Sequence, residues 1–280
     1  MTAGAPAKPM PAGNGANGTS RSPRAITRLP DASLAFCELT HLERTPINAA
    51  RARAQHGAYV DWLRARGVLV EVLEPLAGSP DACFVEDTAI VLDEVAIVTR
   101  PGVESRRGEV DSVAAALAPH RELIRIEAPA ILEGGDVVVT EETLFVGLSG
   151  RTNHAGLKEL AHSVLPFGYR VKAVEVSGCL HLKSAMTLIA PRTLLVQPAW
   201  IDLARVEGFE LIPVDSEEPF AANTLRVGDS LLHPACFPRT RASLSGRGFA
   251  VTPLDIGEFQ KAEGAVSCLS LLLDGGQARR

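Results

Sequence analysis

The chain has 280 residues, of which 46% are hydrophobic and 22% charged, and its formal net charge is −5. This is the composition of a globular protein long enough to bury a large core in one or two domains. A mildly acidic chain has no electrostatic reason to bind nucleic acid or an anionic membrane. No apolar run reaches the roughly 20 residues that are needed to span a bilayer.

Cysteine usage and the start of the chain indicate the cellular compartment. Five cysteines are scattered along the sequence without a CxxC pair, so neither a zinc ribbon nor a thioredoxin-like motif is indicated. An odd, scattered set fits a reducing compartment better than a disulfide framework. The first residues lack the apolar core of a signal peptide. We therefore expect a cytoplasmic protein with neither nucleic acid nor a membrane as partner.

The chain divides into a tail and a folded region. Residues 1–25 are rich in Gly, Ala, Pro and Ser and contain almost nothing large and apolar. Such a segment cannot offset the entropy lost on ordering, and it is predicted to be disordered. Residues 26–280 are predicted to form a single domain.

The first folded elements follow Pro30. A strand is expected around Leu34–Leu39. Thr45 and Pro46 supply an N-cap and a proline at the first helical position, so a helix is predicted from there to Gly67. The apolar run at 68–76 predicts a second strand.

From there one unit recurs along the chain, consisting of a strand, a tight turn and a second strand. Acidic, Pro or Gly residues join the two strands of each pair, as a hairpin requires. The copies cover residues 84–102, 131–150, 180–199 and 222–238, and the strand at 262–274 forms a fifth unit with the N-terminal strand.

The spacing of these units is regular. One polar residue enters the first strand of each unit, and consecutive ones are separated by 47, 48, 42 and 45 residues: Glu86, Glu133, His181, Asn223 and Cys268. A fixed period of this order is typical of repeat architectures. The pattern predicts an α+β fold, a five-fold pseudo-symmetric propeller of ββα-type units whose equivalent strand ends meet at a central axis. A general α+β domain with coincidental hairpin spacing is the alternative.

This arrangement would bring one cysteine, one histidine and three carboxylates together. A thiolate is a strong nucleophile, and a neighbouring imidazole can accept the thiol proton, protonate a leaving amine and then activate water. Carboxylates can orient the imidazole and bind a planar cation. The set of Glu86, Asp87, Glu133, His181 and Cys268 therefore favours attack on a guanidinium carbon, followed by hydrolysis of a covalent thiouronium.

Taken singly, these residues have simpler interpretations. A cysteine in an apolar strand such as VSCLSLLL is more often a small core residue. His181 lies between two leucines and could be a hydrogen-bonded structural histidine. The EGGD segment at 133–136 could be a bulge or a tight turn. The common spacing is what favours the site.

Five strings carry a resemblance to a known family: SPDACFVED, LEGGDV, FVGLSGRTN, CLHLKSAMT and KAEGAVSCLSLLL. Together they resemble the dimethylarginine dimethylaminohydrolases over residues 30–275. That family belongs to the guanidino-group-modifying (pentein) superfamily, whose members are five-fold ββαβ propellers. The resemblance implies that residues 26–280 form a pentein-type catalytic domain with its active site at the central axis.

The resemblance also implies a role for each matching residue. Cys268 matches the nucleophile and His181 the general acid-base residue, while Glu133 matches the carboxylate that supports the histidine and binds the guanidinium. The implied substrate-binding residues are the carboxylates Glu86 and Asp87, Asp81 at the amino-acid end, Arg106 and Arg151 at the α-carboxylate, and the backbone carbonyl of Leu39.

The implied reaction converts Nω-methylated L-arginine (asymmetric dimethylarginine or monomethylarginine) to L-citrulline and dimethylamine or methylamine. No cofactor and no metal site are expected, although zinc could bind the active-site cysteine and histidine as an inhibitor. The protein would be a monomer or a homodimer. A deiminase or hydrolase of another guanidino compound, such as arginine, stays an alternative, because a methyl group is worth only about 1–3 kcal/mol of discrimination.

Two observations weigh on these alternatives. Arginine deiminases tend to have Arg-Asp-Pro where this chain has Glu-Asp-Thr at 86–88, and they carry a helical insertion for which this chain has no room. A non-catalytic, ribosome-binding member of the superfamily shows that the same shape can serve as a binding module. A binding module would have no need of Cys268, His181 and Glu133 together.

Overall fold

The computed structural model describes residues 22–273, which form five three-stranded sheets of identical topology. In each sheet the first strand is antiparallel to the second, and the third is parallel to the second. The first four sheets are β3 (Ala89–Val91), β4 (Val95–Val98) and β5 (Glu122–Arg125); β6 (Val137–Val139), β7 (Thr143–Leu148) and β8 (Arg170–Glu175); β9 (Met186–Ala190), β10 (Thr193–Val196) and β11 (Glu210–Pro213); and β12 (Leu225–Val227), β13 (Ser230–Pro234) and β14 (Ala250–Leu254).

The fifth sheet joins the two ends of the described chain. It consists of β15 (Ser270–Leu273), β1 (Arg24–Arg28) and β2 (Leu69–Leu73), with Arg24 opposite Leu273. Pairing of the first strand with the last closes the ring. The predicted five-fold ββαβ propeller is thereby confirmed.

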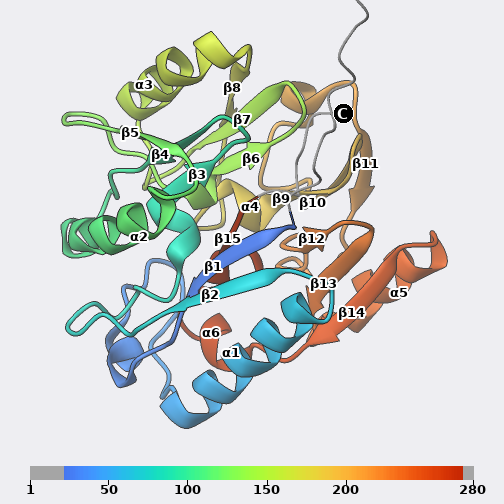
Figure 1. The fold of residues 1–280 in the computed structure, drawn as a ribbon. Helices are drawn as coiled ribbons and strands as arrows, with labels where there is room; N and C mark the ends of the chain where they lie inside the picture. The colour runs from blue at the N-terminus through green and yellow to red at the C-terminus, as the bar shows by residue number, and fades with distance from the viewer. Residues whose placement is uncertain (1–21, 274–280) are drawn as a thin grey trace, which may run out of the picture.

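Crossover segments connect the second and third strands and lie at the periphery (Figure 1). They are α1 (Ala49–Arg64), η3 (Glu104–Glu109) with α2 (Val110–Leu117), α3 (His154–Val164) with η5 (Leu165–Phe167), η6 (Leu203–Val206), and α5 (Pro238–Gly246). A parallel pair of strands needs such a crossover, and a helix usually supplies it. In the sheet of β9–β11 the short 3₁₀ turn η6 takes this place.

Two predictions about the N-terminal region are wrong. The strand that completes the fifth sheet is β1, not a strand at Leu34–Leu39, because residues Ala32–Phe36 form the 3₁₀ helix η1 capped by Asp31. The predicted tail of residues 1–25 extends too far, since Arg24 and Ala25 already belong to β1. Residues 1–21 of that tail lie outside the described residues.

The long N-terminal helix also begins later than predicted. Its N-cap is Asn48, whose side chain accepts a hydrogen bond from the Arg51 N–H, rather than Thr45. The backbone N–H of Asn48 donates to Glu258 at 2.8 Å, in the short helix α6 (Gly257–Gln260). This tertiary contact fixes the start of the helix at a residue that is itself a strong cap.

Hydrophobic clusters fill the interfaces between neighbouring sheets. One cluster combines Ile97 of β4 with Val146 of β7, and the next combines Phe145 of β7 with Leu194 of β10. Equivalent clusters join the remaining pairs of sheets around the ring. The core is thus divided among the interfaces, and the axis itself is left to the first strands and the turns that precede them.

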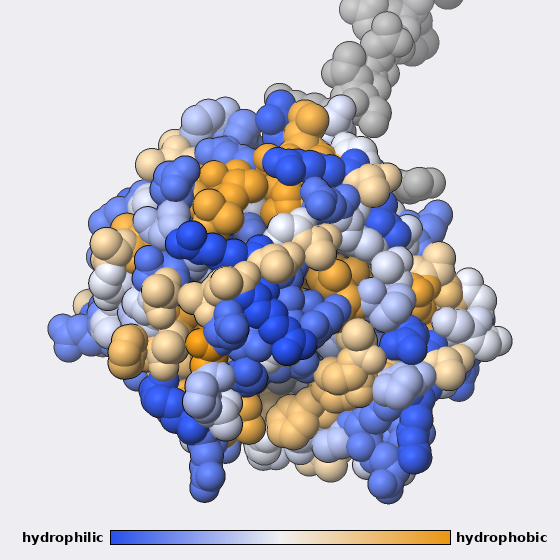
Figure 2. Space-filling view, turned by 90° about the horizontal axis from the view of Figure 1, so that it is seen from below, coloured by the Kyte–Doolittle hydropathy of each residue, from blue (hydrophilic) through white to orange (hydrophobic). Residues whose placement is uncertain are grey.

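The outer surface is mixed in character. Figure 2 shows one face, on which hydrophobic residues form several small areas separated by hydrophilic residues. Within residues 22–273, no helix combines the length and the apolar character that a membrane span requires.

A buried histidine of α1 makes protein stability dependent on pH. His56 is 1% exposed, and its Nε2 lies 2.7 Å from the Thr27 hydroxyl, which donates to the Leu269 carbonyl at 2.6 Å. Because the hydroxyl has one proton, His56 must donate from Nε2 to Thr27. Burial lowers the pKa of His56 from 6.5 to about 4.

We expect this histidine to destabilise the fold in mild acid. Between pH 6.5 and 4 the unfolded chain binds a proton that the folded chain excludes, so stability contributed at pH 7 is lost as pH falls, by roughly 3 kcal/mol. Urea denaturation at pH 7 and pH 5 should show a smaller pH effect in His56→Gln, which keeps a donor for Thr27. An equal pH effect in both proteins would contradict the assignment.

Candidate active site

Short helical turns precede the first strands and meet at one end of the axis. They are η2 (Val85–Thr88), η4 (Gly134–Asp136), α4 (Leu182–Ala185) and η7 (Ser267–Leu269), and η2 contacts both η4 and η7 while α4 contacts η4. The recurring polar residues lie in these turns or cap them, and Asn223 lies two residues before β12. Residues far apart in the sequence are therefore brought together at one place.

The paired glycines of η4 allow this close approach. A Cβ atom on Gly134 would overlap the backbone carbonyl of Glu86, and one on Gly135 would lie 2.7 Å from both Asp87 Oδ1 and His181 Nδ1. The EGGD segment is a tight turn, as the simpler interpretation allowed, but a turn packed against the site. Only a residue without a side chain fits at either position.

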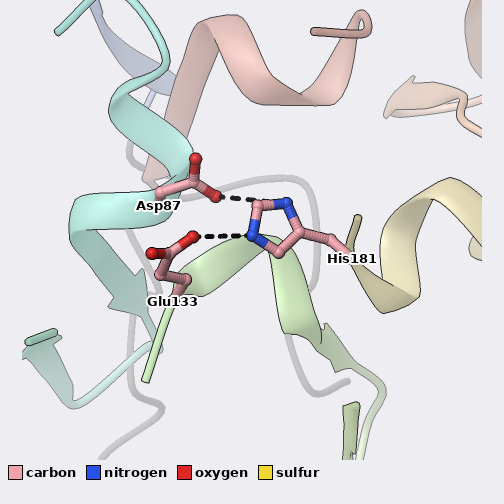
Figure 3. Close-up of side chains that lie close together, drawn as sticks. All are labelled: Asp87, Glu133 and His181. Carbon is pink, nitrogen blue, oxygen red and sulfur yellow. Dashed lines mark hydrogen bonds and ion pairs between the residues drawn. The ribbon is translucent and has the colours of Figure 1, made fainter. Parts of the chain in front are cut away.

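His181 is held between two carboxylates (Figure 3). Its Nε2 lies 2.7 Å from Glu133 Oε2 and its Nδ1 lies 3.8 Å from Asp87 Oδ1, and all three residues are buried. Burial disfavours the imidazolium, but the charges of Asp87, Glu133 and Asp136 and the hydrogen bond that the ring donates to Glu133 outweigh burial and raise the pKa of His181 to about 9. His181 is thus an imidazolium at neutral pH.

Asp136 connects the turn that follows His181 to Ser149 and Thr152. Its Oδ1 accepts the backbone N–H of Leu182 at 3.0 Å, and its Oδ2 accepts the hydroxyls of Ser149 and Thr152 at 2.6 and 2.7 Å. The residue is fully buried. No role was predicted for Asp136, although its place as the last residue of the EGGD segment was a signal for one.

Glu86, the third carboxylate of the site, forms an ion pair with Lys183. Lys183 Nζ donates to its Oε1 at 2.6 Å, and the Ser267 hydroxyl donates to its Oε2 at 2.7 Å. Neither partner was predicted, although Lys183 follows His181 by two residues and Ser267 precedes Cys268. These three residues also line a cavity of about 110 Å³ between the first strands, on the axis.

Asp87 pairs with a buried arginine. Arg106 Nη1 donates to Asp87 Oδ2 at 2.7 Å, and the same guanidinium bonds Glu109 at 2.9 Å and the carbonyls of Asp81 and Phe84. Burial opposes ionisation of Asp87, but the charges of His181 and Arg106 lower its pKa. The structure thus places Arg106, predicted at the substrate α-carboxylate, in a set of protein contacts around Asp87.

Arg151 reaches Glu133, the second carboxylate beside His181. Its Nη1 lies 3.5 Å from Glu133 Oε1, and its Nη2 donates to the Thr40 hydroxyl at 3.1 Å. Every oxygen of Glu86, Asp87 and Glu133 thereby has a protein partner within the described residues. Two of these partners are guanidinium groups, the same chemical group that the site was predicted to bind.

The segment with Leu39 lies beside the site and is tied down by acidic residues. Asp81 Oδ2 accepts the backbone N–H of Glu38 at 3.0 Å. The carboxylate of Glu263, whose φ is 58°, accepts the backbone N–H groups of Thr40, His41 and Leu42. The Leu39 side chain packs against the core cluster of the fifth sheet.

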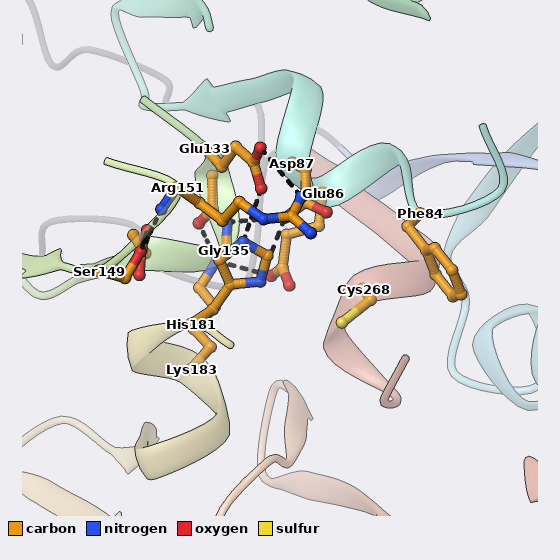
Figure 4. A network of polar contacts seen from close by, with 12 residues as sticks. Phe84, Glu86, Asp87, Glu133, Gly135, Ser149, Arg151, His181, Lys183 and Cys268 are labelled. Carbon is orange, nitrogen blue, oxygen red and sulfur yellow. Dashed lines mark hydrogen bonds and ion pairs between the residues drawn. The ribbon is translucent and has the colours of Figure 1, made fainter. Parts of the chain in front are cut away.

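Cys268 faces the histidine from across the site (Figure 4). The residue is half-buried, and its Sγ accepts the Ala265 N–H at 3.4 Å. Burial, together with the charges of Glu86 and Asp87, raises the thiol pKa above its ordinary value. The resting site therefore combines a neutral thiol with an imidazolium, and an added cation beside the thiol would favour its ionisation.

Three groups of the site could also hold a metal ion. Ligand atoms of Asp87, Glu133 and His181 lie within 4.8 Å of one another. Arg106 and Arg151 already neutralise the two carboxylates. Cys179, a potential metal ligand two residues before His181, donates its thiol to the His181 carbonyl at 3.3 Å. The contacts present thus favour cationic organic groups over a divalent metal.

A ring of five ββαβ units, with a cysteine, a histidine and carboxylates at its axis, defines a protein of the guanidino-group-modifying (pentein) class. The family described as "N,N dimethylarginine dimethylhydrolase, eukaryotic" matches residues 35–231. An N(G),N(G)-dimethylarginine dimethylaminohydrolase of Streptomyces coelicolor is 40% identical over 90% of this chain and 97% of its own. One of Pseudomonas aeruginosa is 34% identical over 88% and 97%.

A solved structure agrees with these relatives. A cysteine-to-serine mutant of the Pseudomonas aeruginosa enzyme, complexed with citrulline, superposes with a TM-score of 0.83 at 32% identity, over 89% of this chain and 98% of that chain. The chain therefore belongs to the dimethylarginine dimethylaminohydrolase family, as the sequence motifs predicted.

Proposed function

We propose that the protein hydrolyses Nω-methylated L-arginine, as asymmetric dimethylarginine or monomethylarginine, to L-citrulline and dimethylamine or methylamine. The observation that carries this proposal is that Cys268 and His181 face each other among three buried carboxylates. A family named for dimethylarginine hydrolysis, and a relative solved with citrulline, support the same substrate class.

The substrate guanidinium would lie between Cys268 and the carboxylates of Glu133, Asp87 and Glu86. Each carboxylate oxygen has about two lone pairs and can accept a further hydrogen bond beside its protein partner. Arg151 would leave Glu133 and turn to the substrate α-carboxylate, while Arg106 stays paired with Asp87 and Glu109.

Asp81 and the Leu39 carbonyl would receive the α-amino group of the substrate. The carboxylate of Asp81 already holds the backbone N–H of Glu38, next to Leu39. Substrate binding would thus order both amino-acid contacts together.

The first half of the reaction follows from the protonation states. His181 is already protonated, so the thiol proton passes to solvent when the cationic substrate lowers the thiol pKa. The thiolate attacks the guanidinium carbon, forming the C–S bond. His181 then donates its proton to the methylated nitrogen, the C–N bond breaks, and the amine leaves a thiouronium on Cys268.

The second half uses the neutral imidazole. His181 accepts a proton from water as the water oxygen attacks the thiouronium carbon. The C–S bond breaks, the sulfur leaves as thiolate, the second proton of the water passes to solvent, and citrulline carries the new carbonyl oxygen. Glu133 and Asp87 stabilise the imidazolium at both ends of the cycle.

The direct test is citrulline production from asymmetric dimethylarginine, monomethylarginine, symmetric dimethylarginine and arginine. Turnover of the first two substrates is the expected result. Activity on arginine alone would assign a deiminase, which is the second candidate because the site contacts recognise a guanidinium with or without methyl groups. Silence on all four by the folded protein would overturn the substrate assignment and point to another guanidino compound or to a binding role.

We further infer that the chain from β1 onwards acts as one catalytic domain in the cytoplasm, as a monomer or a homodimer, without a cofactor. Glu86, Asp87, Glu133, His181 and Cys268 lie in or cap the turns around a single ring. Size-exclusion chromatography with light scattering would distinguish the two oligomeric states.

A further inference from the structure

Asn223 occupies the fifth equivalent position of the ring but has no part in the reaction described above. It lies two residues before β12, as Cys268 lies two residues before β15, and it is 2% exposed. The other four equivalent residues face the proposed substrate position or hold a charge beside it. The side chain of Asn223 instead contacts the two neighbouring units.

Three hydrogen bonds fix the orientation of the Asn223 amide. Its Nδ2 donates to the Ser267 hydroxyl at 2.9 Å and to the Lys183 carbonyl at 3.1 Å, and its Oδ1 accepts the backbone N–H of Ser267 at 3.0 Å. These partners, two acceptors and one donor, are the complement of an amide, which offers two N–H donors and one oxygen acceptor. Asn223 thus joins the turn that precedes β15 to the turn that precedes β9.

The direction of these hydrogen bonds determines the direction of the bond between Ser267 and Glu86. Because Nδ2 can only donate, Ser267 Oγ accepts from Asn223 and its single proton goes to Glu86 Oε2, 2.7 Å away. Lys183 donates to the other oxygen of Glu86. An ordered chain therefore runs from Asn223 through Ser267 to Glu86, whose charge lies beside the Cys268 thiol.

We propose that Asn223 is a positioning residue for the nucleophile. It holds both the backbone and the side chain of Ser267, the residue before Cys268, and thereby directs Sγ towards His181 and keeps the hydroxyl of Ser267 on Glu86. The inference rests on the proposed role of Cys268. Asn223 itself does not touch the reacting atoms.

The test is the near-isosteric Asn223→Asp variant. The second carboxylate oxygen would face the Lys183 carbonyl, which cannot donate to it. The Ser267 hydroxyl would turn to donate to this new carboxylate and would no longer donate to Glu86. We expect kcat for dimethylarginine to fall by about 100-fold, since small misplacements of reacting groups have effects of this size. KM should change little, because Asn223 does not bind substrate.

A second readout does not require turnover. Alkylation of Cys268 by iodoacetamide, followed over pH by mass spectrometry of the Cys268 peptide, reports ionisation of this thiol alone. The added carboxylate in Asn223→Asp should move its midpoint upwards by about one pH unit. Asn223→Ala removes the hydrogen bonds without adding charge, and we expect the lower kcat with a smaller pH shift.

Thr187→Val is the matched control. Thr187 donates to the Ala222 carbonyl at 2.6 Å, a buried hydrogen bond between the same two units and one residue from Asn223. Its loss should lower the melting temperature and leave kcat and the alkylation midpoint unchanged. A comparable loss of kcat in this variant would show that any bond at the interface matters, and would overturn the specific role of Asn223.

The outcomes separate this inference from the proposed function. An inactive wild type would overturn the proposed function, and the alkylation measurement would still decide whether Asn223 controls Cys268. Wild-type kcat and alkylation in folded Asn223→Asp would overturn the inference. If Asn223→Asp does not fold, Ser267→Ala is the deciding variant, because it removes the hydrogen bond from Ser267 to Glu86. An unshifted pH midpoint of Cys268 alkylation in Ser267→Ala would contradict the proposal.

Discussion

Replacement of Cys268 by serine is expected to abolish turnover of dimethylarginine, by about 10⁴-fold or more. A serine hydroxyl is nearly isosteric with the thiol but does not ionise near neutral pH, so the bound guanidinium cannot generate the nucleophile. The half-buried position of Cys268 accommodates the smaller oxygen atom without rearrangement. Steady-state citrulline formation measures the loss.

Two further measurements make this test specific. Acid quenching of wild type during turnover should trap a mass adduct on the Cys268 peptide, and the serine variant should show none. Cys236→Ser is the control, because Cys236 is an exposed free cysteine that contacts Gln260. Substantial activity in Cys268→Ser, or loss of activity in Cys236→Ser, would place the nucleophile elsewhere.

The second large effect is expected for Glu133→Gln. Glu133 is 0% exposed and supplies the shortest contact to His181, at 2.7 Å. The amide keeps the size and can still accept from Nε2, but it removes the charge that stabilises the imidazolium. We expect kcat to fall by about 10³-fold, the scale of a lost general acid.

The pH dependence distinguishes this role from simple misfolding. His181 has a pKa of about 9, raised from 6.5, so wild-type kcat should decline as pH rises through about 9 and the proton donor is lost. In Glu133→Gln the pKa falls towards its ordinary value, and the decline should begin at lower pH.

Glu258→Gln is the matched control for this substitution. Glu258 is another buried glutamate, which lies in α6 outside the site. Its carboxylate pairs with Lys261 at 2.8 Å. This variant should lose stability without any change in the pH at which kcat declines. An unchanged decline in Glu133→Gln would contradict the assignment of His181 as the proton donor.

Local sequence determined most of the architecture. Paired apolar strands with acidic, Pro or Gly turns predicted the first two strands of four sheets, because a hairpin is a local structure whose turn and strands are adjacent in the chain. The period of the polar residues predicted that these units form a ring. Family motifs then assigned roles to Cys268, His181 and Glu133, and the structure brings these three residues to one end of the axis.

The prediction of the N-terminal strand at Leu34–Leu39 was wrong for a physical reason. The segment RAITR at 24–28 is short, follows a stretch rich in small residues and has no neighbouring strand in the sequence to pair with. The segment Leu34–Leu39 is apolar enough to be taken for the strand instead. Pairing with β2, beyond α1, and with β15, at the other end of the chain, makes β1 a strand. A prediction that relies on neighbouring residues cannot contain that information.

The sequence by itself determined the repeat, the five equivalent positions and the chemistry that their side chains can perform. The tertiary structure alone decided which carboxylate pairs with which cation: Lys183 with Glu86, Arg106 with Asp87 and Arg151 with Glu133. It also decided that His181 is charged at rest and that the thiol is not. Protonation states depend on burial and on charges from several units of the ring, and these distances exist only once the ring has closed.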